Sequence, residues 1–204
     1  MQKHIIPAFQ TIKNDEIKIL DICFGLGYNT FASILHSNKK LHIISPELDL
    51  ELVKNLENFK YPIEFSPLTE IIKEVSKNNF YEDERIKIEV LIGDAREYLK
   101  NCDEKFDIIY QDAFSPKNNP SLWSYEYFED IKKVIKKDGI LTTYSVASPV
   151  RYALYLLEFN LYTHDSKIIR DGTIASLSKL EFKKVDFEEK LKRITPTLYR
   201  DFTN

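Results

Sequence analysis

Four acidic residues each follow an apolar, strand-like run in this chain, and their side chains are the first candidates for chemistry. They are Asp21, Glu47, Asp94 and Asp112. Parallel strands bring their carboxyl ends to one edge of a sheet, which is where such sheets bind ligands. A single acid at such a position is commonly a helix N-cap. Four of them in register indicate a binding site lined with carboxylates.

A glycine turn follows the first of these acids. It reads Phe-Gly-Leu-Gly-Tyr-Asn-Thr over 24–30, and Asn29 or the threonine after it can cap the helix that begins there. Gly25 and Gly27 can adopt backbone angles closed to other residues and let a ligand approach the main chain. A dinucleotide fingerprint has a third glycine, and Asp21 is unfavourable beside a pyrophosphate. A cofactor with an ammonium and a sulfonium group accepts a carboxylate there, which favours S-adenosylmethionine.

The other acids fit successive parts of that cofactor. Glu47 comes 20 residues after Gly27, the spacing at which an acid can accept hydrogen bonds from both ribose hydroxyls. Asp94 can accept from the adenine amino group while the Ala95 backbone meets the ring. Asp112 is expected closest to the transferable methyl group.

The loop that starts at Asp112 is where we expect the reaction. Methyl transfer displaces an already activated sulfonium, so positioning of the acceptor supplies most of the rate. Asp112 can accept from an amine N–H, and it either helps to remove the amine proton or only orients the amine. Phe114 either stacks on a base or packs in the core.

The elements that must position these residues alternate between strand and helix. We expect helices at 3–13, 29–38, 49–59, 67–78, 124–135 and 149–159, and strands at 17–22, 41–45, 86–92, 106–111 and 140–145. Two further strands, 165–170 and 173–178, are joined by Asp171-Gly172, a two-residue hairpin signal. This order predicts an α/β fold with a doubly wound, Rossmann-like sheet and a closing antiparallel hairpin. It is typical of a class I methyltransferase rather than of a dinucleotide dehydrogenase.

Composition sets broad limits on the protein. A chain of 204 residues with 43% hydrophobic residues predicts one domain over 1–204, with a charged tail at 181–204. Cys23 and Cys102 have neither metal-ligand nor disulfide-framework spacing, so we expect no metal site and a reducing compartment. No apolar run is long enough to span a bilayer, and we expect a cytoplasmic protein. The net charge of -3 argues against nucleic-acid binding over the whole surface.

Several motifs together resemble the MnmC-like methyltransferase domain, whose best-known members form 5-methylaminomethyl-2-thiouridine at the tRNA wobble position. The matching stretches are the turn at 24–30, Gly-Asp-Ala-Arg at 93–96, Asp-Ala-Phe-Ser-Pro-Lys-Asn-Asn-Pro-Ser-Leu-Trp at 112–123, parts of 143–151, and Tyr-Arg-Asp at 199–201. The resemblance covers most of the chain, and the 112–123 loop is its most specific part.

The resemblance implies transfer of a methyl group from S-adenosylmethionine to the exocyclic amine of 5-aminomethyl-2-thiouridine in the tRNA anticodon stem-loop. It places Asp112 at the methyl group. The cofactor residues would be Asp21, Phe24, Gly25, Gly27, Asn29, Glu47, Asp94 and Ala95. Phe114, Pro116 and Lys117 would shape the substrate pocket, and Arg151 would contact phosphate or base.

The chain also departs from the family pattern. Many members are fused to a flavin oxidoreductase, for which we find no matching stretch among these residues. We therefore expect this chain to perform only the methyl step, after a separate oxidoreductase or aminomethyl-forming enzyme. An upstream segment of the family is expected to be absent as well, which would leave the pocket open or completed by another chain. Local basic clusters would then contact tRNA: Lys132, Lys133, Lys136 and Lys137, and in the tail Lys183, Lys184, Lys190, Lys192 and Arg193.

Two other functions stay open at this point. A polyamine-synthase-like aminopropyltransferase shares the sheet and its ring of acids, but it needs further acids near 112–120, where Lys117 stands instead. A non-catalytic tRNA-binding or assembly subunit would keep the fold with an incomplete pocket. Binding of S-adenosylmethionine would separate the second alternative from an enzyme.

Overall fold

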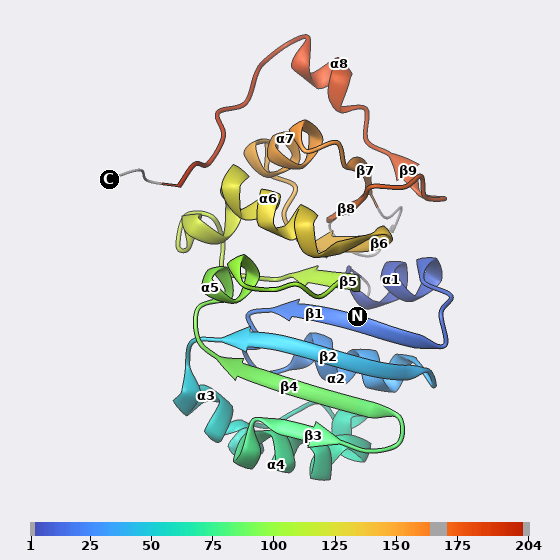
Figure 1. Ribbon diagram of the computed structural model, residues 1–204, viewed down its shortest axis with the longest axis vertical. Coiled ribbons are helices and arrows are strands. Elements are labelled where there is room, and N and C mark those ends of the chain that lie inside the picture. The colour runs from blue at the N-terminus through green and yellow to red at the C-terminus, as the bar shows by residue number, and fades with distance from the viewer. Residues whose placement is uncertain (1–2, 164–170, 202–204) are drawn as a thin grey trace.

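A mixed β-sheet crosses the molecule in the computed structural model, which describes residues 3–163 and 171–201 (Figure 1). Within these residues the strands lie in the order β3-β4-β2-β1-β5-β6-β8-β7-β9. Their bounds are β1 Glu16–Ile22, β2 Lys40–Glu47, β3 Phe80–Glu82, β4 Ile86–Ile92, β5 Phe106–Gln111, β6 Ile135–Thr143, β7 Asn160–Thr163, β8 Thr173–Ser176 and β9 Lys183–Lys184.

Five neighbouring strands, β4, β2, β1, β5 and β6, run parallel to one another. Their carboxyl ends therefore share one edge of the sheet. β8 is antiparallel to both β6 and β7, and it enters between them. The predicted doubly wound sheet with a reversed strand near its end is confirmed.

Helices cover both faces of this sheet, as the side chains of the strands require (Figure 1). Along β1, Ile17 and Ile19 face one hydrophobic cluster, while Leu20 and Ile22 face the other, because successive side chains of a strand point to opposite faces. The α-helices are α1 Ile5–Thr11, α2 Tyr28–His36, α3 Leu50–Lys54, α4 Thr69–Asn78, α5 Ala95–Lys100, α6 Tyr125–Val134, α7 Ser148–Leu156 and α8 Phe187–Leu191. The first four supply the first cluster and the last four the second.

Two short stretches differ from the predicted helices. The helix predicted at 49–59 is split into α3 and the 3₁₀ turn Leu56–Asn58. The helix predicted from residue 67 begins as α4 at Thr69, after the 3₁₀ helix Ile63–Leu68. A further 3₁₀ helix, Pro120–Trp123, closes the loop that follows β5.

The second half of the sheet departs further from the sequence prediction. β6 begins at Ile135, directly after α6, and not at residue 140. The strand that precedes β8 and pairs with it is β7, Asn160–Thr163, directly after the helix predicted at 149–159, so Asp171-Gly172 does not form a two-residue hairpin loop. The strand predicted at 165–170 lies outside the described residues. The predicted charged tail contains both β9 and α8.

Among residues 3–163 and 171–201, no helix combines the length and the apolar character needed to cross a membrane.

Candidate active site

A cavity of about 520 Å³ opens at the carboxyl edge of β1, β2, β4 and β5. This is the edge at which the sequence places its four acids. The predicted site residues that line the cavity are Phe24, Gly25, Asn29, Glu47, Asp94, Ala95, Asp112 and Phe114. The topology thus brings residues up to 90 positions apart, from Phe24 to Phe114, around one hollow.

The glycine turn after β1 is tied to the end of β2 by Glu47. The Gly25 N–H donates to Glu47 Oε2 at 2.8 Å, and the Asp49 N–H donates to Glu47 Oε1 at 3.0 Å. Gly25 has a φ of +54°, in the left-handed region that favours glycine. A carboxylate has about four acceptor positions, so Glu47 can hold this loop and still accept from a ligand.

Gly27 shapes the turn without reaching the cavity. Its φ is +70°, and a Cβ at this position would lie 2.5 Å from the ring of Phe31 and 2.7 Å from that of Phe24. Its carbonyl accepts from the Phe31 N–H at 2.8 Å, which starts α2. Only glycine combines this backbone angle with the close approach of two aromatic rings.

Asp94 caps the helix that follows β4. Its Oδ1 accepts from the Arg96 N–H at 2.8 Å, the usual bond of an N-cap. The same residue lines the cavity beside Gly93 and Ala95. Capping therefore orients the carboxylate, and its remaining acceptor positions are free to serve a ligand.

Asp21 is buried behind the cavity, with 1% of its surface exposed. Thr30 Oγ1 donates to its Oδ2 at 2.8 Å, and Asn29 Nδ2 lies 3.4 Å from its Oδ1. Burial raises the pKa of Asp21 to about 8, although the hydrogen bond from Thr30 opposes the rise. Asp21 is thus largely protonated at neutral pH, and it reaches the cavity through Asn29.

Asp112 stands where the cavity meets the loop after β5, and its side chain is 37% exposed. Asn29 Nδ2 donates to its Oδ2 at 3.0 Å, and His4 Nε2 lies 3.5 Å from its Oδ1. His4 Nδ1 in turn lies 2.9 Å from Thr142 Oγ1, which fixes the ring. Burial would raise the pKa of Asp112, but the hydrogen bonds from His4 and Asn29 outweigh it and lower the pKa. The group is a carboxylate at neutral pH.

The loop that carries Asp112 is anchored at its carbonyl groups. Trp123 Nε1 donates to the Phe114 carbonyl at 2.7 Å, and Tyr144 Oη donates to the Ala113 carbonyl at 3.0 Å. These bonds leave the Phe114 side chain 76% exposed at the cavity. Phe114 therefore does not pack in the core, and stacking on a base stays as the predicted role of its side chain.

Besides Asp21 and Gly27, three residues predicted to bind the substrate lie apart from the cavity lining: Pro116, Lys117 and Arg151. Pro116 and Lys117 belong to the 112–123 loop, and Lys117 is exposed. Arg151 Nε donates to Thr173 Oγ1 at 2.9 Å and its Nη2 to the Gly172 carbonyl at 3.2 Å. Its guanidinium joins α7 to β8, a placement that favours a structural role over a contact with phosphate or base.

Sequence reasoning missed several residues of the site. Leu48, Asp49 and Leu52 line the cavity directly after Glu47. The sequence could have predicted them, because residues just after the carboxyl end of a parallel strand lie at the edge of the sheet where ligands bind. His4 gave no such signal, since its contact with Asp112 joins residues more than 100 positions apart.

A profile of the family described as S-adenosyl-L-methionine-dependent methyltransferase matches residues 61–177, more than half of the chain. The chain belongs to this methyltransferase family. The prediction of a cofactor-dependent methyltransferase from the acids and the glycine turn is confirmed, and S-adenosylmethionine is its cofactor.

Individual relatives of the methyltransferase point to the same domain. An uncharacterized protein of Methanocaldococcus jannaschii is 31% identical over 173 residues, covering 81% of this chain and 48% of that protein. The tRNA 5-methylaminomethyl-2-thiouridine biosynthesis bifunctional protein MnmC of Campylobacter hominis is 32% identical over 152 residues, covering 69% of this chain and 22% of that protein. The chain spans less than half the length of either relative.

A solved structure matches most of the methyltransferase. MnmC2 from Aquifex aeolicus superposes with a TM-score of 0.78 at 32% identity, over 93% of this chain and 63% of that chain. The resemblance to MnmC-like methyltransferase domains drawn from the motifs is thus confirmed.

The cavity of the methyltransferase fits its cofactor in space and chemistry. Gly25 and Gly93 line it, and a Cβ at Gly93 would meet no atom within 4 Å, while one at Gly25 would come no closer than 3.9 Å to a neighbour. Both glycines leave this space to a ligand. Glu47 and Asp94 can accept from hydroxyl and amino groups, and Leu48 supplies an apolar surface for a ring.

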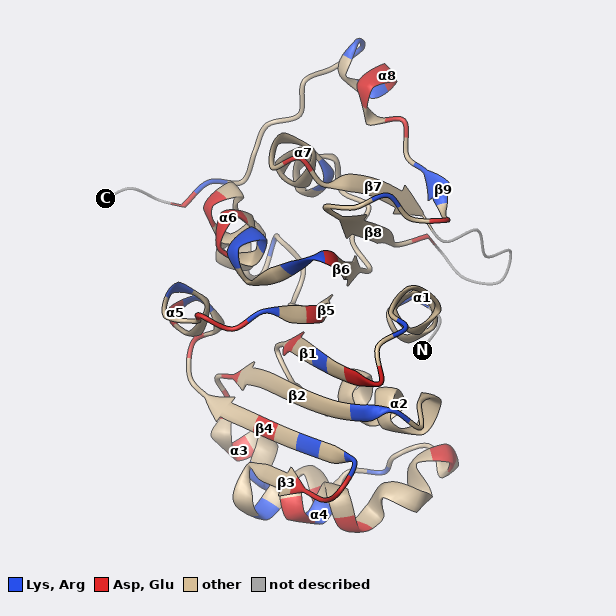
Figure 2. Cartoon of the chain, turned by 45° about the vertical axis from the view of Figure 1, so that its right-hand side comes forward, with Lys and Arg blue, Asp and Glu red and all other residues tan. Residues whose placement is uncertain are grey.

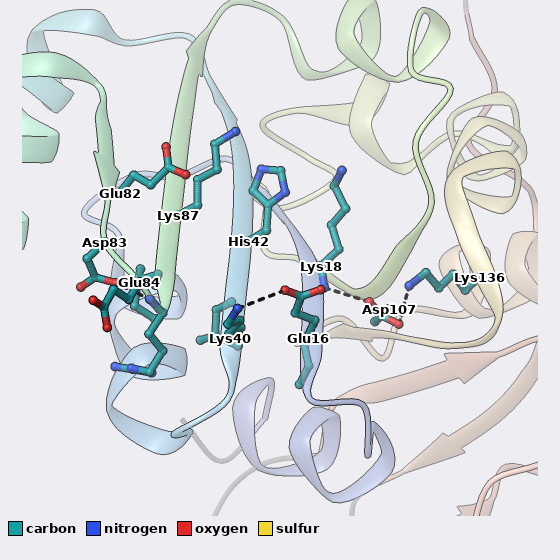
Figure 3. Close-up of a pocket in the computed structure, with 14 residues that line it drawn as sticks. Glu16, Lys18, Lys40, His42, Glu82, Asp83, Glu84, Lys87, Asp107 and Lys136 are labelled. Carbon is teal, nitrogen blue, oxygen red and sulfur yellow. Dashed lines mark hydrogen bonds and ion pairs between the residues drawn. The ribbon is translucent and has the colours of Figure 1, made fainter.

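A second hollow of the methyltransferase, of about 480 Å³, lies at the amino ends of the parallel strands (Figure 3). Figure 3 marks two ion pairs among its side chains: Lys136 Nζ lies 2.8 Å from Asp107 Oδ1, and Lys40 Nζ lies 3.7 Å from Glu16 Oε1. Lysine and arginine side chains line this hollow together with acids, whereas the charged residues that line the cavity at the carboxyl edge are all acidic.

Proposed function

We propose that the methyltransferase transfers a methyl group from S-adenosylmethionine to the exocyclic amine of 5-aminomethyl-2-thiouridine at the tRNA wobble position. The observation that carries the proposal is the Asp112 carboxylate at the cavity, beside an exposed aromatic ring, in a chain 32% identical to MnmC2 over 93% of its length. The substrate is inferred from the name of the MnmC relatives.

The chain's own residues meet the needs of amine methylation. The bound cofactor supplies an electrophilic methyl group on sulfur. An amine attacks through its lone pair, so it must give up a proton, and the new N–C bond forms as the S–C bond breaks. Asp112 can hold the amine by accepting one N–H and can take the proton, because its lowered pKa keeps it ionised. His4 and Asn29 fix its two oxygens.

Phe114 suits recognition of a single unpaired base. Its side chain is 76% exposed at the cavity, and unstacked bases of single-stranded RNA loops stack on such aromatic rings. An anticodon loop presents bases of this kind. Phe114 would hold the uridine ring while its aminomethyl group reaches Asp112.

Part of the basic cluster at α6 that was predicted to contact tRNA is paired with acids. Lys132 Nζ lies 2.8 Å from Glu158 Oε2, and Lys133 Nζ lies 2.8 Å from Asp130 Oδ1. In α6 and α8 acidic residues precede the lysines, whereas β9 consists of two lysines (Figure 2). Lys117 is our first candidate for phosphate contact, because it is exposed on the same 112–123 loop that lines the cavity.

Methyl transfer to tRNA tests this function directly. Purified protein would be incubated with isotopically labelled S-adenosylmethionine and tRNA from cells lacking the methyl step, and the digested nucleosides identified by mass. We expect label in 5-methylaminomethyl-2-thiouridine. Because Asp112→Asn removes the proton acceptor, it should lower the rate by about 10²-fold.

Two controls make this result specific. Asp103→Asn alters an exposed acid outside the cavity lining, and it should leave the rate unchanged. Calorimetry with S-adenosylhomocysteine should show that Asp112→Asn still binds the cofactor product. Label in another nucleoside, or none in a protein that binds the cofactor, would contradict the proposed acceptor.

A further inference from the structure

The segment 199–201, matched by a family motif in the sequence, docks on the start of α6. The Tyr125 N–H donates to the Tyr199 carbonyl at 2.9 Å, and the Asp201 N–H donates to Glu126 Oε2 at 3.0 Å. Arg200 Nε lies 2.8 Å from Glu126 Oε1. Main-chain and side-chain bonds together fix this segment against the body of the protein.

Asp201 forms the strongest contact of the segment, with Arg96. Its two carboxylate oxygens accept from Arg96 Nη1 and Nη2, each at 2.5 Å. The Arg96 side chain is only 11% exposed and that of Asp201 32%. A two-bond pair of this type orients a guanidinium as well as attracting it. Losing the carboxylate would leave a mostly buried cation without its counter-charge.

Arg96 connects two walls of the cofactor cavity. It follows directly on Gly93, Asp94 and Ala95, which line one side. Its Nη1 donates to the carbonyl of Ser121 at 2.8 Å, and Ser121 lines the side formed by the 112–123 loop. The same nitrogen donates to Ser124 Oγ, the cap of α6, at 3.1 Å. One guanidinium thus links the helix that follows Gly93 and Asp94 to the wall formed by the 112–123 loop.

We propose that Asp201 is a positioning residue for the cofactor cavity: by holding Arg96 it keeps the Gly93–Ala95 turn and the Ser121 wall at the separation that the methyl donor needs. Asp201 is therefore part of the cofactor machinery and not of an RNA-binding tail. The charges around it support this assignment, since Arg96 and Arg200 are balanced by Asp201 and Glu126. The proposal rests only on cofactor binding in the cavity and not on the identity of the acceptor.

The chain offers a matched pair of variants for the test. Asp201→Asn keeps the size of the side chain but removes the charge that holds Arg96. Arg200→Gln removes the adjacent ion pair to Glu126, which fixes the same segment without contacting Arg96. Asp201→Glu restores a carboxylate. Affinity for S-adenosylhomocysteine would be measured by calorimetry, and the KM for S-adenosylmethionine separately from kcat.

We expect Asp201→Asn to weaken S-adenosylhomocysteine binding by about tenfold, the effect of losing one charge-assisted contact. The KM for S-adenosylmethionine should rise with it, while kcat at saturation changes little. Arg200→Gln should bind within about twofold of the wild type, and Asp201→Glu should recover part of the loss. Hydrogen exchange in 93–96 and 119–124 should increase in Asp201→Asn alone.

Two results would overturn the proposal. One is wild-type affinity in Asp201→Asn. The other is an equal loss in Arg200→Gln, which would mean that docking of the segment matters and the Arg96 contact does not. A wild-type protein that fails to bind S-adenosylhomocysteine would overturn the cofactor site as well. Binding without methylation of tRNA would affect only the proposed acceptor.

Discussion

At the scale of single residues, the site sets two carboxyl groups to opposite protonation states. Asp21 and Asp112 lie on either side of the Asn29 amide, which donates to both. Burial keeps Asp21 largely protonated, whereas hydrogen bonds from His4 and Asn29 keep Asp112 ionised. The negative charge is thus concentrated at the cavity, where an amine and a sulfonium would meet it.

The protonation of Asp21 predicts a pH-dependent stability. Its pKa is raised from 3.8 to about 8, so between these values the folded protein holds a proton that the unfolded chain has lost. The free energy of unfolding must then fall as pH rises through this window. Relative to Asp21→Asn, which cannot titrate, the wild type should lose roughly 1 kcal/mol per pH unit between about pH 5 and pH 7.

Urea unfolding of both proteins at several pH values, followed by circular dichroism, measures this difference. The comparison isolates Asp21, because all other titrating groups are shared. If the free energy of unfolding depended on pH in the same way in both proteins, Asp21 would be ionised in the folded state.

At the scale of elements, apolar runs in the sequence predicted the parallel strands. The prediction failed where a stretch with the composition of a turn lies inside a strand. Lys137-Asp138-Gly139 has the composition of a turn, and it predicts that a strand starts after it. In the structure these residues lie inside β6, which pairs Ile135 with Phe106 and then shifts register before Ile108. A bulge of this kind absorbs a polar, glycine-containing stretch within a strand, and no periodicity signals it.

The glycine turn before α2 could be predicted from the sequence, because its positive φ angles favour glycine. Two alanine variants separate its functions. Gly25→Ala and Gly27→Ala each place a side chain at a positive φ, at a cost of roughly 1 kcal/mol. Gly27→Ala also drives its Cβ into the Phe31 ring, which should add about 1–3 kcal/mol. Gly25→Ala should instead lower cofactor affinity, since its Cβ projects into cavity space.

Urea unfolding and calorimetry with S-adenosylhomocysteine together read out both effects. We expect Gly27→Ala to lose more unfolding free energy than Gly25→Ala. Among the folded proteins, Gly25→Ala should lose more affinity for S-adenosylhomocysteine than Gly27→Ala. Equal stability losses would rule out the close aromatic packing around Gly27.

At the scale of the whole molecule, the cavity is assembled from four strand ends, and this part was predictable. Asp21 and Glu47 lie in the last two residues of β1 and β2, and Asp94 and Asp112 follow β4 and β5. Parallel strands must bring such residues to one edge. Contacts across long sequence separations were not predictable. Asp201 meets Arg96 across 105 positions, and nothing in either local sequence indicates the pairing. The sequence therefore predicted a charged tail, whereas residues 199–201 of it pack against the start of α6 in the structure.

The most direct test of the central claim is cofactor affinity at the carboxyl edge, measured by calorimetry with S-adenosylhomocysteine. Glu47→Ala removes the acceptor assigned to the ribose and should weaken binding by about tenfold or more. Lys87→Ala, in the second hollow, should bind like the wild type. The wild type should bind one cofactor per chain. Undiminished binding by Glu47→Ala, or a loss confined to Lys87→Ala, would contradict the placement of the active site at this edge.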